Sequence, residues 1–492
     1  MKPNILFLMT DQMRGDCLGI AGHPDVKTPY LDTLAARGHY FPNAYTACPS
    51  CIAARSVLWT GKSPAHTGRV GYKDGVSWDY DNTLAEILGK AGYTTQCVGK
   101  MHVHPLRNRL GFENVLLHDG YLGYYRRSQT PYYEHQAVAD DYFYWLKTEL
   151  GSAADITDTG LECNSWVARP WPYEEKYHPT NWVTSNAIDF LRKRDRSKPF
   201  FLTASYVRPH PPFDAPACYF DLYRDRALTP PPVGEWAAPY ASDYAGRSYD
   251  GADGIADPEL LRQAQIGYYA CITHLDHQIG RLLQALGQDG QMENTIILFA
   301  SDHGELLGDH HTFRKTRPYQ GSIRIPLIFS APESLLPKRG IRHTAVAGLE
   351  DILPTLAEWA GAPLPSDLDG HSLLPLLKGS ESPVRPYLHG EHSGGDLGNQ
   401  FIVTETDKFC WYMESGAEEY FDLASDPQEC RNRISDPACQ ERILQLRSWL
   451  IAELEGREEG YTDGTRLIPG RPQQAVLNHC PPSQHRKKAD NP

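Results

Sequence analysis

The chain has 492 residues, of which 41% are hydrophobic and 22% are charged, a composition typical of a soluble globular protein. Its length exceeds the roughly 250–300 residues that one hydrophobic core usually supports, so we expect a large domain with a smaller one appended. The formal net charge of −13 makes the surface a poor partner for nucleic acid or an anionic membrane. A local basic pocket can still bind an anion inside such a protein.

The cysteines and the N-terminal segment are the features from which we predict the cellular compartment of the protein. Eleven cysteines, an odd number without pairwise spacing, do not resemble a disulfide framework and favour a reducing environment. The apolar run from Ile5 to Met9 is too short for the core of a signal peptide and lacks a small-residue cleavage site. No other stretch approaches the ~18 apolar residues that a membrane span needs. We therefore expect a cytoplasmic protein without a signal peptide or transmembrane segment.

Strand-like apolar runs alternate with amphipathic helical segments along the chain. In chain order the pattern predicts a strand at 4–10, helices at 28–38, 51–60 and 83–92, strands at 93–100 and 199–207, a long helix at 257–286, and strands at 295–302 and 325–332. This rhythm is typical of a parallel sheet that helices cover on both faces. Such sheets place their functional sites at the carboxyl ends of the strands.

Three further segments differ from this rhythm. Residues from about 105 to 180 are rich in Tyr, Trp, Gly and His without a clean period, which suggests an insertion that forms a wall of the substrate pocket. After a large α/β domain at 1–380, residues 381–466 alternate like antiparallel strands and end in an amphipathic helix, which predicts a small subdomain. Residues 467–492 are polar and proline-bearing, as in an extended tail.

Acidic and imidazole side chains follow two of the predicted strands. Asp11 ends the first strand, and Asp302 and His303 end the strand at 295–302. Two carboxylates at neighbouring strand ends can hold a divalent cation, and oxygen ligands favour Ca²⁺, Mg²⁺ or Mn²⁺. A histidine ligand shifts the choice towards Mn²⁺ or Zn²⁺. The alternative is that these aspartates cap helices or turns.

Basic residues gather at similar positions: Arg55, Lys100, His102, His210 and Lys315. An anion that is cleaved beside a metal ion needs such cations, because they neutralise the charge that develops as the ester bond breaks. The alternative for any one of them is a solvated loop position.

The stretch "CIAARSVLWTG", residues 51–61, resembles the sulfatase signature, in which a Cys or Ser is followed by Pro or Ala, then Arg, then Thr-Gly. In that family the cysteine is oxidised to formylglycine, an aldehyde whose hydrate is the nucleophile, so the candidate is Cys51 and not Cys48. Further similar motifs are "PNILFLMTDQMRGD", "TPYLDTLAARGHYFPNAY", "GKMHVH", "RPHPPFDAP", "NTIILFASDHGELLGDHH", "SIRIPLIF" and "EYFDLASDPQECRN".

The resemblance implies an alkaline-phosphatase-like α/β fold, a mostly parallel sheet flanked by helices, with a small C-terminal antiparallel subdomain. It implies one divalent metal ion, Ca²⁺ first and Mn²⁺ or Mg²⁺ as alternatives. The implied metal ligands are Asp11, Asp302, His303 and the formylglycine oxygen from Cys51, with Gln12 as a weaker ligand. The implied catalytic residues are Arg55, which holds the aldehyde hydrate; Lys100 and Lys315, which contact the sulfate; and His102 and His210, which move protons.

The sequence departs from the family pattern in two places. Many sulfatases have two consecutive aspartates where this chain has Asp11 and Gln12, and an asparagine at the position of His303. One fewer carboxylate leaves the metal identity open. The proline typical of the signature is Ala53 here, and because alanine occurs there in part of the family, we still expect conversion of Cys51.

The implied activity is metal-dependent hydrolysis of a sulfate ester, either of an aryl compound or of a saccharide. The implied partner is a formylglycine-generating or sulfatase-maturating enzyme, and a homo-oligomer is an open alternative. The main rival function is a phosphonate monoester or phosphodiester hydrolase of the same superfamily, which "RPHPPF" and "SDHGELLGDHH" also resemble; "GKMHVH" favours a sulfatase.

Two other functions agree less well with the sequence. Cys48 and Cys51 form a C-x-x-C, as in a redox pair or half a zinc site, but no second such pair stands at zinc spacing. A non-catalytic binding protein would need a lost ligand, and none is missing. The aromatic residues that could form a platform for a sugar or aryl ring, or pack loops down instead, are Trp78, Tyr80, Tyr121, Tyr124, Tyr125, Trp166 and Trp171.

Overall fold

The computed structural model describes residues 2–121, 139–241 and 249–480. Its centre is an eight-stranded sheet in the order β5-β4-β6-β1-β7-β8-β2-β9. The bounds are β5 Asn114–Leu117, β4 Thr94–Gly99, β6 Phe200–Pro209, β1 Asn4–Asp11, β7 Thr295–Ser301, β8 Leu327–Ser330, β2 Gly38–Tyr40 and β9 Ile341–Arg342. The five strands from β5 to β7 are parallel, and β8 runs antiparallel to both of its neighbours. The predicted, mostly parallel α/β sheet is confirmed.

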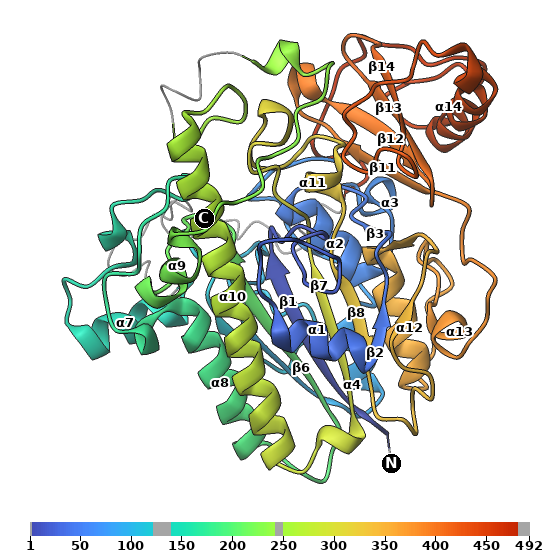
Figure 1. Cartoon of the computed structure of the whole chain (residues 1–492). Coiled ribbons are helices and arrows are strands. Elements are labelled where there is room, and N and C mark those ends of the chain that lie inside the picture. The colour runs from blue at the N-terminus through green and yellow to red at the C-terminus, as the bar shows by residue number, and fades with distance from the viewer. Residues whose placement is uncertain (1, 122–138, 242–248, 481–492) are drawn as a thin grey trace, which may run out of the picture.

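Helices cover both faces of this sheet (Figure 1). Successive side chains of a strand point to opposite faces, and in β1 Leu6 and Leu8 pack into one core while Ile5, Phe7 and Met9 pack into the other. The helices against the first core are α1 Pro29–Ala36, α7 Asp141–Leu150, α8 Pro179–Lys193, α9 Ala217–Arg224 and α10 Pro258–Gln288. Those against the second are α2 Cys51–Thr60, α4 Leu84–Lys90, α12 Ile352–Trp359 and α13 Leu374–Leu377.

Shorter elements complete the large domain. Helix α3 spans Pro64–Thr67 and helix α11 spans Gln320–Ile323, while β3 Ala44–Tyr45 pairs with β10 Ala347–Gly348. None of the helices in the described part of the chain is both long and apolar enough to cross a membrane.

A second, antiparallel sheet follows the large domain, as the sequence predicts. It consists of β11 Leu388–His392, β12 Asn399–Val403, β13 Asp407–Tyr412 and β14 Glu418–Asp422. One face packs on α14 Gln440–Leu454 through side chains such as Ile402 and Phe409. The other face, which includes Phe401 and Val403, shares a small core with Tyr45 and Ile323 of the large domain. The second sheet is therefore packed on both faces and is tied to the first (Figure 1).

The last described residues run back along the large domain. The backbone N–H of Val70 donates to the carbonyl of Ala475 at 3.1 Å. The backbone N–H of Leu477 donates to the carbonyl of Gly68 at 2.8 Å. Residues 467–480 thus reach the loop that follows α3. The remainder of the predicted tail lies outside the described residues.

Candidate active site

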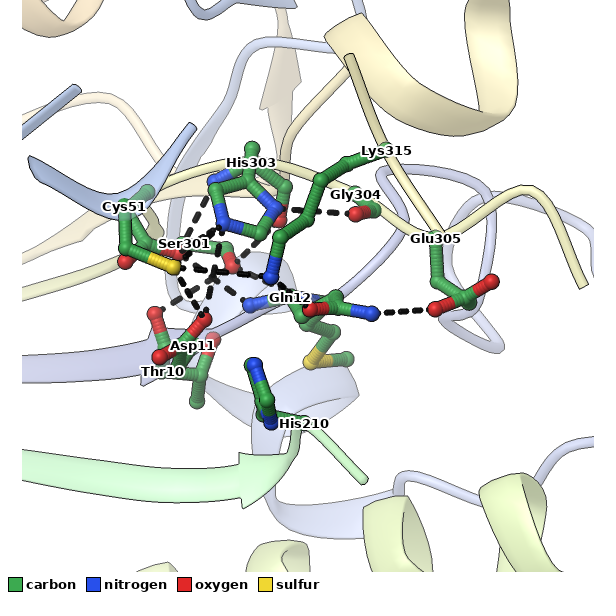
Figure 2. Close-up of polar contacts among 12 residues, drawn as sticks. Thr10, Asp11, Gln12, Cys51, His210, Ser301, His303, Gly304, Glu305 and Lys315 are labelled. Atoms are coloured by element: carbon green, nitrogen blue, oxygen red, sulfur yellow. Dashed lines mark hydrogen bonds and ion pairs between the residues drawn. The ribbon is translucent and has the colours of Figure 1, made fainter. Parts of the chain in front are cut away.

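The carboxyl ends of β1 and β7 bring the predicted metal ligands together. Thr10 pairs with Ser301 in the parallel register, so the residues that follow, Asp11 and Asp302, emerge side by side. Asp11, Cys51, Asp302 and His303 are buried and offer ligand atoms that all lie within 4.8 Å of one another. Figure 2 shows Asp11, Cys51 and His303 facing one another across this cluster. Two carboxylates with one imidazole are a donor set that fits a divalent cation such as Ca²⁺ or Mn²⁺.

Cys51 is the first residue of α2, after Ser50 in an extended conformation. Its sulfur, which stands where the formylglycine oxygen would lie, is 3.6 Å from Oδ1 of Asp11 and 3.5 Å from Nζ of Lys315. Burial and Asp11 would raise the pKa of the Cys51 thiol, but Lys315, Lys100 and His303 together lower it. Burial instead raises the pKa of Cys48 well above its usual value. The pKa values of the two thiols are therefore shifted in opposite directions, and Cys51 is the one at the cluster.

His303 presents a defined nitrogen to the cluster. Its Nδ1 lies 3.0 Å from the carbonyl oxygen of Gly304, which can only accept, so Nδ1 carries a proton. Nε2 then faces Cys51 Sγ at 3.2 Å and Asp11 Oδ1 at 3.5 Å. A carbonyl that fixes the tautomer in this way is the usual support of a metal-binding histidine.

Two buried cations balance the carboxylates. Lys100, which directly follows β4, forms an ion pair with Asp11. Burial alone would raise the pKa of Asp11, but Lys100, and after it His210 and Lys315, hold it well below its usual value. Arg55 lies one turn after Cys51 on α2 and donates from Nε to Asp302 at 2.9 Å.

The two terminal nitrogens of the Arg55 guanidinium group, Nη1 and Nη2, differ in their contacts. Nη1 donates to the carbonyl of Lys100 at 2.8 Å and to Ser205 Oγ at 3.2 Å. Nη2 is buried and has no hydrogen-bond partner among the described residues. A fixed guanidinium with one unused donor is suited to bind an oxygen near Cys51.

Lys315 and Gln12 meet at the edge of the cluster. Nζ of Lys315 donates to Oε1 of Gln12, whose amide nitrogen donates to Glu305 (Figure 2). The backbone N–H of Gln12 donates to Asp302 Oδ1 at 3.1 Å. The side-chain oxygen of Gln12 thus faces the ammonium group of Lys315, beside the cluster.

The two predicted proton-transfer histidines lie at the same cavity. His210 donates from Nδ1 to the carbonyl of Pro211 at 2.7 Å, which leaves Nε2 as its second nitrogen. Burial, and then Lys315, lower the pKa of His210 well below its usual value. The backbone of His102 is in the left-handed region, with φ 58°, and its backbone N–H donates to Asp119 Oδ1 at 2.9 Å.

A cavity of about 490 Å³ opens in front of the cluster. Cys51, Lys100, His102, His210 and Lys315 all contribute to its wall. The other lining residues are Ser50, Tyr72, Asp119, Tyr121, Cys163, Asn164, Val207, Pro211, Ala252, Arg314 and Thr316. The structure therefore gathers all of the predicted site residues at one cavity or directly behind it.

The aromatic residues that could form a platform for a sugar or aryl ring lie in different parts of the structure. Tyr121 lines the cavity, whereas Trp78, Trp166 and Trp171 are buried in the two large cores. Tyr80 accepts a hydrogen bond from Arg69 at 2.7 Å. Tyr124 and Tyr125 lie outside the described residues. The segment from 105 to 180 thus supplies part of the cavity wall and also part of the core.

The sequence did not reveal several residues that support the site. Ser205 contacts Arg55, Glu305 binds Gln12, and Asp119 accepts the N–H groups of Met101 and His102. His392, at the end of β11, is buried, and His303 and Lys315 contribute after burial itself to lowering its pKa to about 4. Of these residues, Glu305 had a signal in the sequence, because it lies in the "SDHGE" motif.

The fold and the cluster define a class of protein. A mostly parallel sheet brings buried carboxylates, a cysteine at the start of a helix and several cations to one cavity, which is an arrangement that suits a metal-dependent hydrolase of anionic esters.

Comparison with known proteins narrows the class. The family model described as Sulfatase matches residues 3–362, and that described as N-sulphoglucosamine sulphohydrolase, C-terminal, matches residues 308–455. An arylsulfatase of Clostridium perfringens is 51% identical and covers 97% of this chain and 100% of its own. A choline-sulfatase of Rhizobium meliloti is 31% identical over 89% of this chain and 83% of its own. The phosphonate monoester hydrolase of Agrobacterium radiobacter has a similar structure, with a TM-score of 0.74 at 24% identity over 92% of this chain and 95% of its own.

The chain belongs to the sulfatase family. The resemblance inferred from the sequence motifs is confirmed, and with it the alkaline-phosphatase-like fold and the assignment as a sulfuric ester hydrolase.

Proposed function

We propose that this protein hydrolyses aryl sulfate esters with a formylglycine made from Cys51 and one divalent metal ion, with Ca²⁺ the first choice. The observation that carries the proposal is the position of Cys51, whose sulfur lies within the carboxylate and imidazole cluster and beside Lys315. Conversion of Cys51 requires a formylglycine-generating or sulfatase-maturating enzyme. The 51% identical arylsulfatase supports the aryl ester as substrate.

A bound metal ion and the oxidation of Cys51 to formylglycine would supply part of the chemistry. A divalent cation held by Asp11, Asp302, His303 and the Cys51-derived oxygen would polarise the sulfate and favour loss of a proton from the nucleophile. A formylglycine made from Cys51 would, as its hydrate, supply one hydroxyl as the nucleophile and a second hydroxyl through which the aldehyde could be restored when sulfate leaves. Gln12, whose backbone N–H donates to Asp302 Oδ1 at 3.1 Å, is assigned as an additional, weaker ligand.

The remaining residues bind the anion and move protons. Lys100 and Lys315 line the cavity with Cys51, and we assign them to neutralise the sulfate oxygens. Arg55 is assigned to hold the hydrate through Nη2, which has no hydrogen-bond partner among the described residues. His210 Nε2 is assigned to the leaving-group oxygen, and the negative charge of a bound sulfate ester would raise the pKa of this histidine towards the range that proton donation needs. His102 is assigned to the second hydroxyl.

The cavity wall supports an aromatic leaving group. Tyr72, Tyr121, Val207 and Pro211 give it an apolar side, on which a ring can pack. We further propose that the catalytic domain spans residues 1–380 and that the subdomain at 381–466 and the tail at 467–492 shape the cavity or an oligomer contact.

The experiment that tests this function is a comparison of matched esters. Purified enzyme with converted Cys51 is assayed on 4-nitrophenyl sulfate, on the corresponding phenylphosphonate monoester and phosphodiester, and on sulfated monosaccharides. The proposal predicts the highest kcat/KM for the aryl sulfate. A higher kcat/KM for the phosphonate monoester would contradict it and assign the rival function.

A further inference from the structure

The loop that carries Lys315 has an unfavourable backbone on both sides of the lysine. Arg314 and Thr316 have φ angles of 68° and 85°. Residues other than glycine rarely adopt this left-handed region, and a β-branched threonine does so least readily. Such a conformation persists only where neighbouring groups fix it. The position of the Lys315 ammonium group therefore depends on what holds the loop.

The large domain fixes the side before the lysine. The backbone N–H of Arg314 donates to the carboxylate of Glu305, and the N–H of Leu306 donates to the carbonyl of Arg314 at 2.8 Å. Glu305 also binds Gln12, so this side of the loop is tied to the end of β1.

The C-terminal sheet fixes the side after the lysine. The carbonyl of Thr316 accepts from Nδ2 of Asn399 at 2.9 Å, and the carbonyl of Pro318 accepts from Nζ of Lys408. The N–H of Gln320 donates to Oε2 of Glu429 at 2.8 Å. Asn399 begins β12, Lys408 lies in β13 and Glu429 follows β14. Three backbone groups between residues 316 and 320 are thus bound by side chains of the smaller sheet or of the segment that follows it.

Asn399 is the member of this set nearest to the lysine. It is fully buried, and its amide nitrogen donates to the carbonyls of both Thr316 and Leu397, each at 2.9 Å. Because both contacts are carbonyl oxygens, the nitrogen must face them, and the orientation of the amide is fixed. Thr316 O is therefore held at a defined point relative to β12.

We infer that Asn399 is a positioning residue for Lys315, through which the C-terminal sheet sets where the ammonium group meets the sulfate. Asn399 acts through the carbonyl of Thr316 and does not touch the substrate. The inference rests on the proposed role of Lys315 at the sulfate. It makes the smaller sheet part of the sulfate-binding apparatus.

The first test compares two substitutions in one strand. Asn399→Leu keeps the branched shape and removes the donor. Gln400→Met is the control, because Gln400 is equally buried in β12 but donates to Glu391 and not to the Lys315 loop. Misplacing a group that binds substrate costs on the order of 10- to 100-fold. We expect Asn399→Leu to lower kcat/KM by that factor and to weaken the binding of inorganic sulfate in calorimetry, while Gln400→Met stays near wild type in both.

Melting curves establish that the variants are folded, and metal analysis establishes that they contain the metal ion. If Asn399→Leu does not fold, Asn399→Ala, which removes the donor without adding bulk, carries the same comparison. Sulfate affinity and kcat/KM equal to wild type in a folded Asn399 variant would overturn the inference.

The second test separates positioning from a general structural effect. Lys315→Met is combined with Asn399→Leu. If Asn399 acts through Lys315, the double variant is no worse than Lys315→Met alone. Losses that multiply would show that Asn399 acts elsewhere and would overturn the inference. Wild-type kcat/KM in Lys315→Met would instead refute the proposed role of Lys315, and the inference with it.

Discussion

The sulfur of Cys51 lies 3.2 Å from Nε2 of His303, although 252 residues separate the two in the chain. The start of α2 supplies the cysteine, and the end of β7 supplies the histidine. The sheet register that aligns β1 with β7 also sets Asp11 beside Asp302. Cys51 and the three candidate ligand side chains thus meet at one point, where the parallel strands β1 and β7 end at one edge of the sheet.

Asp302 should be essential for metal binding. Asp302→Asn removes one of two buried carboxylates from the cluster, so metal content should fall and kcat/KM should drop by about 100-fold or more. Chelation of the wild type should abolish turnover in the same way. Asp309→Asn is the control, since Asp309 is a buried carboxylate bound to Arg14 at 2.8 Å and lies outside the cluster. Full activity of metal-free Asp302→Asn would refute the ligand assignment.

His210 should matter most for substrates with poor leaving groups. A general acid contributes about 10²–10⁴-fold where the departing oxygen needs a proton. His210→Ala should therefore lower kcat strongly for phenols and alcohols of high pKa and weakly for 4-nitrophenyl sulfate. The measurement is the slope of log kcat against leaving-group pKa. His274→Gln, a change at a buried histidine bound to Asn181, should leave that slope unchanged. An equal loss on all substrates in His210→Ala would contradict the assignment.

Glu419 should make the protein less stable as the pH rises. Burial raises the pKa of Glu419 to about 7, against hydrogen bonds from Tyr412 and the nearby charge of Lys408. Because the folded-state pKa lies above the ordinary value of 4.5, the native state binds the proton more tightly. The stability from this group is full below about pH 4.5 and is lost as the pH rises through about 7.

The test of this pH dependence is Glu419→Gln. Relative to wild type, the free energy of unfolding of the variant should increase between about pH 5 and about pH 8, by at most about 1.4 kcal/mol per pH unit. Denaturant unfolding at both pH values measures it. Glu418→Gln, at the neighbouring position whose carboxylate binds Arg447, should not show this increase. A pH-independent difference for Glu419→Gln would contradict the prediction.

The tail should influence substrate binding and leave the metal in place. Residues 475–477 bind the backbone of residues 68–70, next to Tyr72 of the cavity wall. Truncation after residue 466 should therefore raise KM or change the preferred ester, with unchanged metal content. Truncation after residue 480, which retains these hydrogen bonds, is the control. Loss of metal in the shorter protein alone would show that the tail supports the cluster itself.

The positions of the candidate ligands could be predicted from the sequence, and those of their supports could not. Asp11 and Asp302 end apolar runs, and Cys51 is indicated by its place in the stretch that resembles the sulfatase signature. Asn399 and Asp119 act by binding backbone groups of residues 316 and 101–102. No residue type or spacing marks such a contact, because the partner is a peptide group that every residue carries.

Sequence patterns also could not predict which aromatic residues pack in the core and which line the cavity. Trp166 lies in the segment expected to form the pocket wall, yet it stacks on Phe313 at 4.7 Å between ring centroids and is 1% exposed. Tyr121, from the same segment, does line the cavity. Aromatic side chains serve both roles, and only the tertiary contacts separate them.

The measurement that tests the account most directly is the mass of the peptide that contains Cys51 in active enzyme. Co-produced with a formylglycine-generating enzyme, the protein should carry an aldehyde at Cys51 and an unchanged thiol at Cys48, with a peptide lighter by about 18 Da under the side-chain oxidation chemistry of cysteine. The converted fraction should track kcat across preparations. Cys51→Ala should bind metal and sulfate without turnover, and Cys48→Ala should stay active. Fully active enzyme with an unmodified Cys51 thiol would contradict the account.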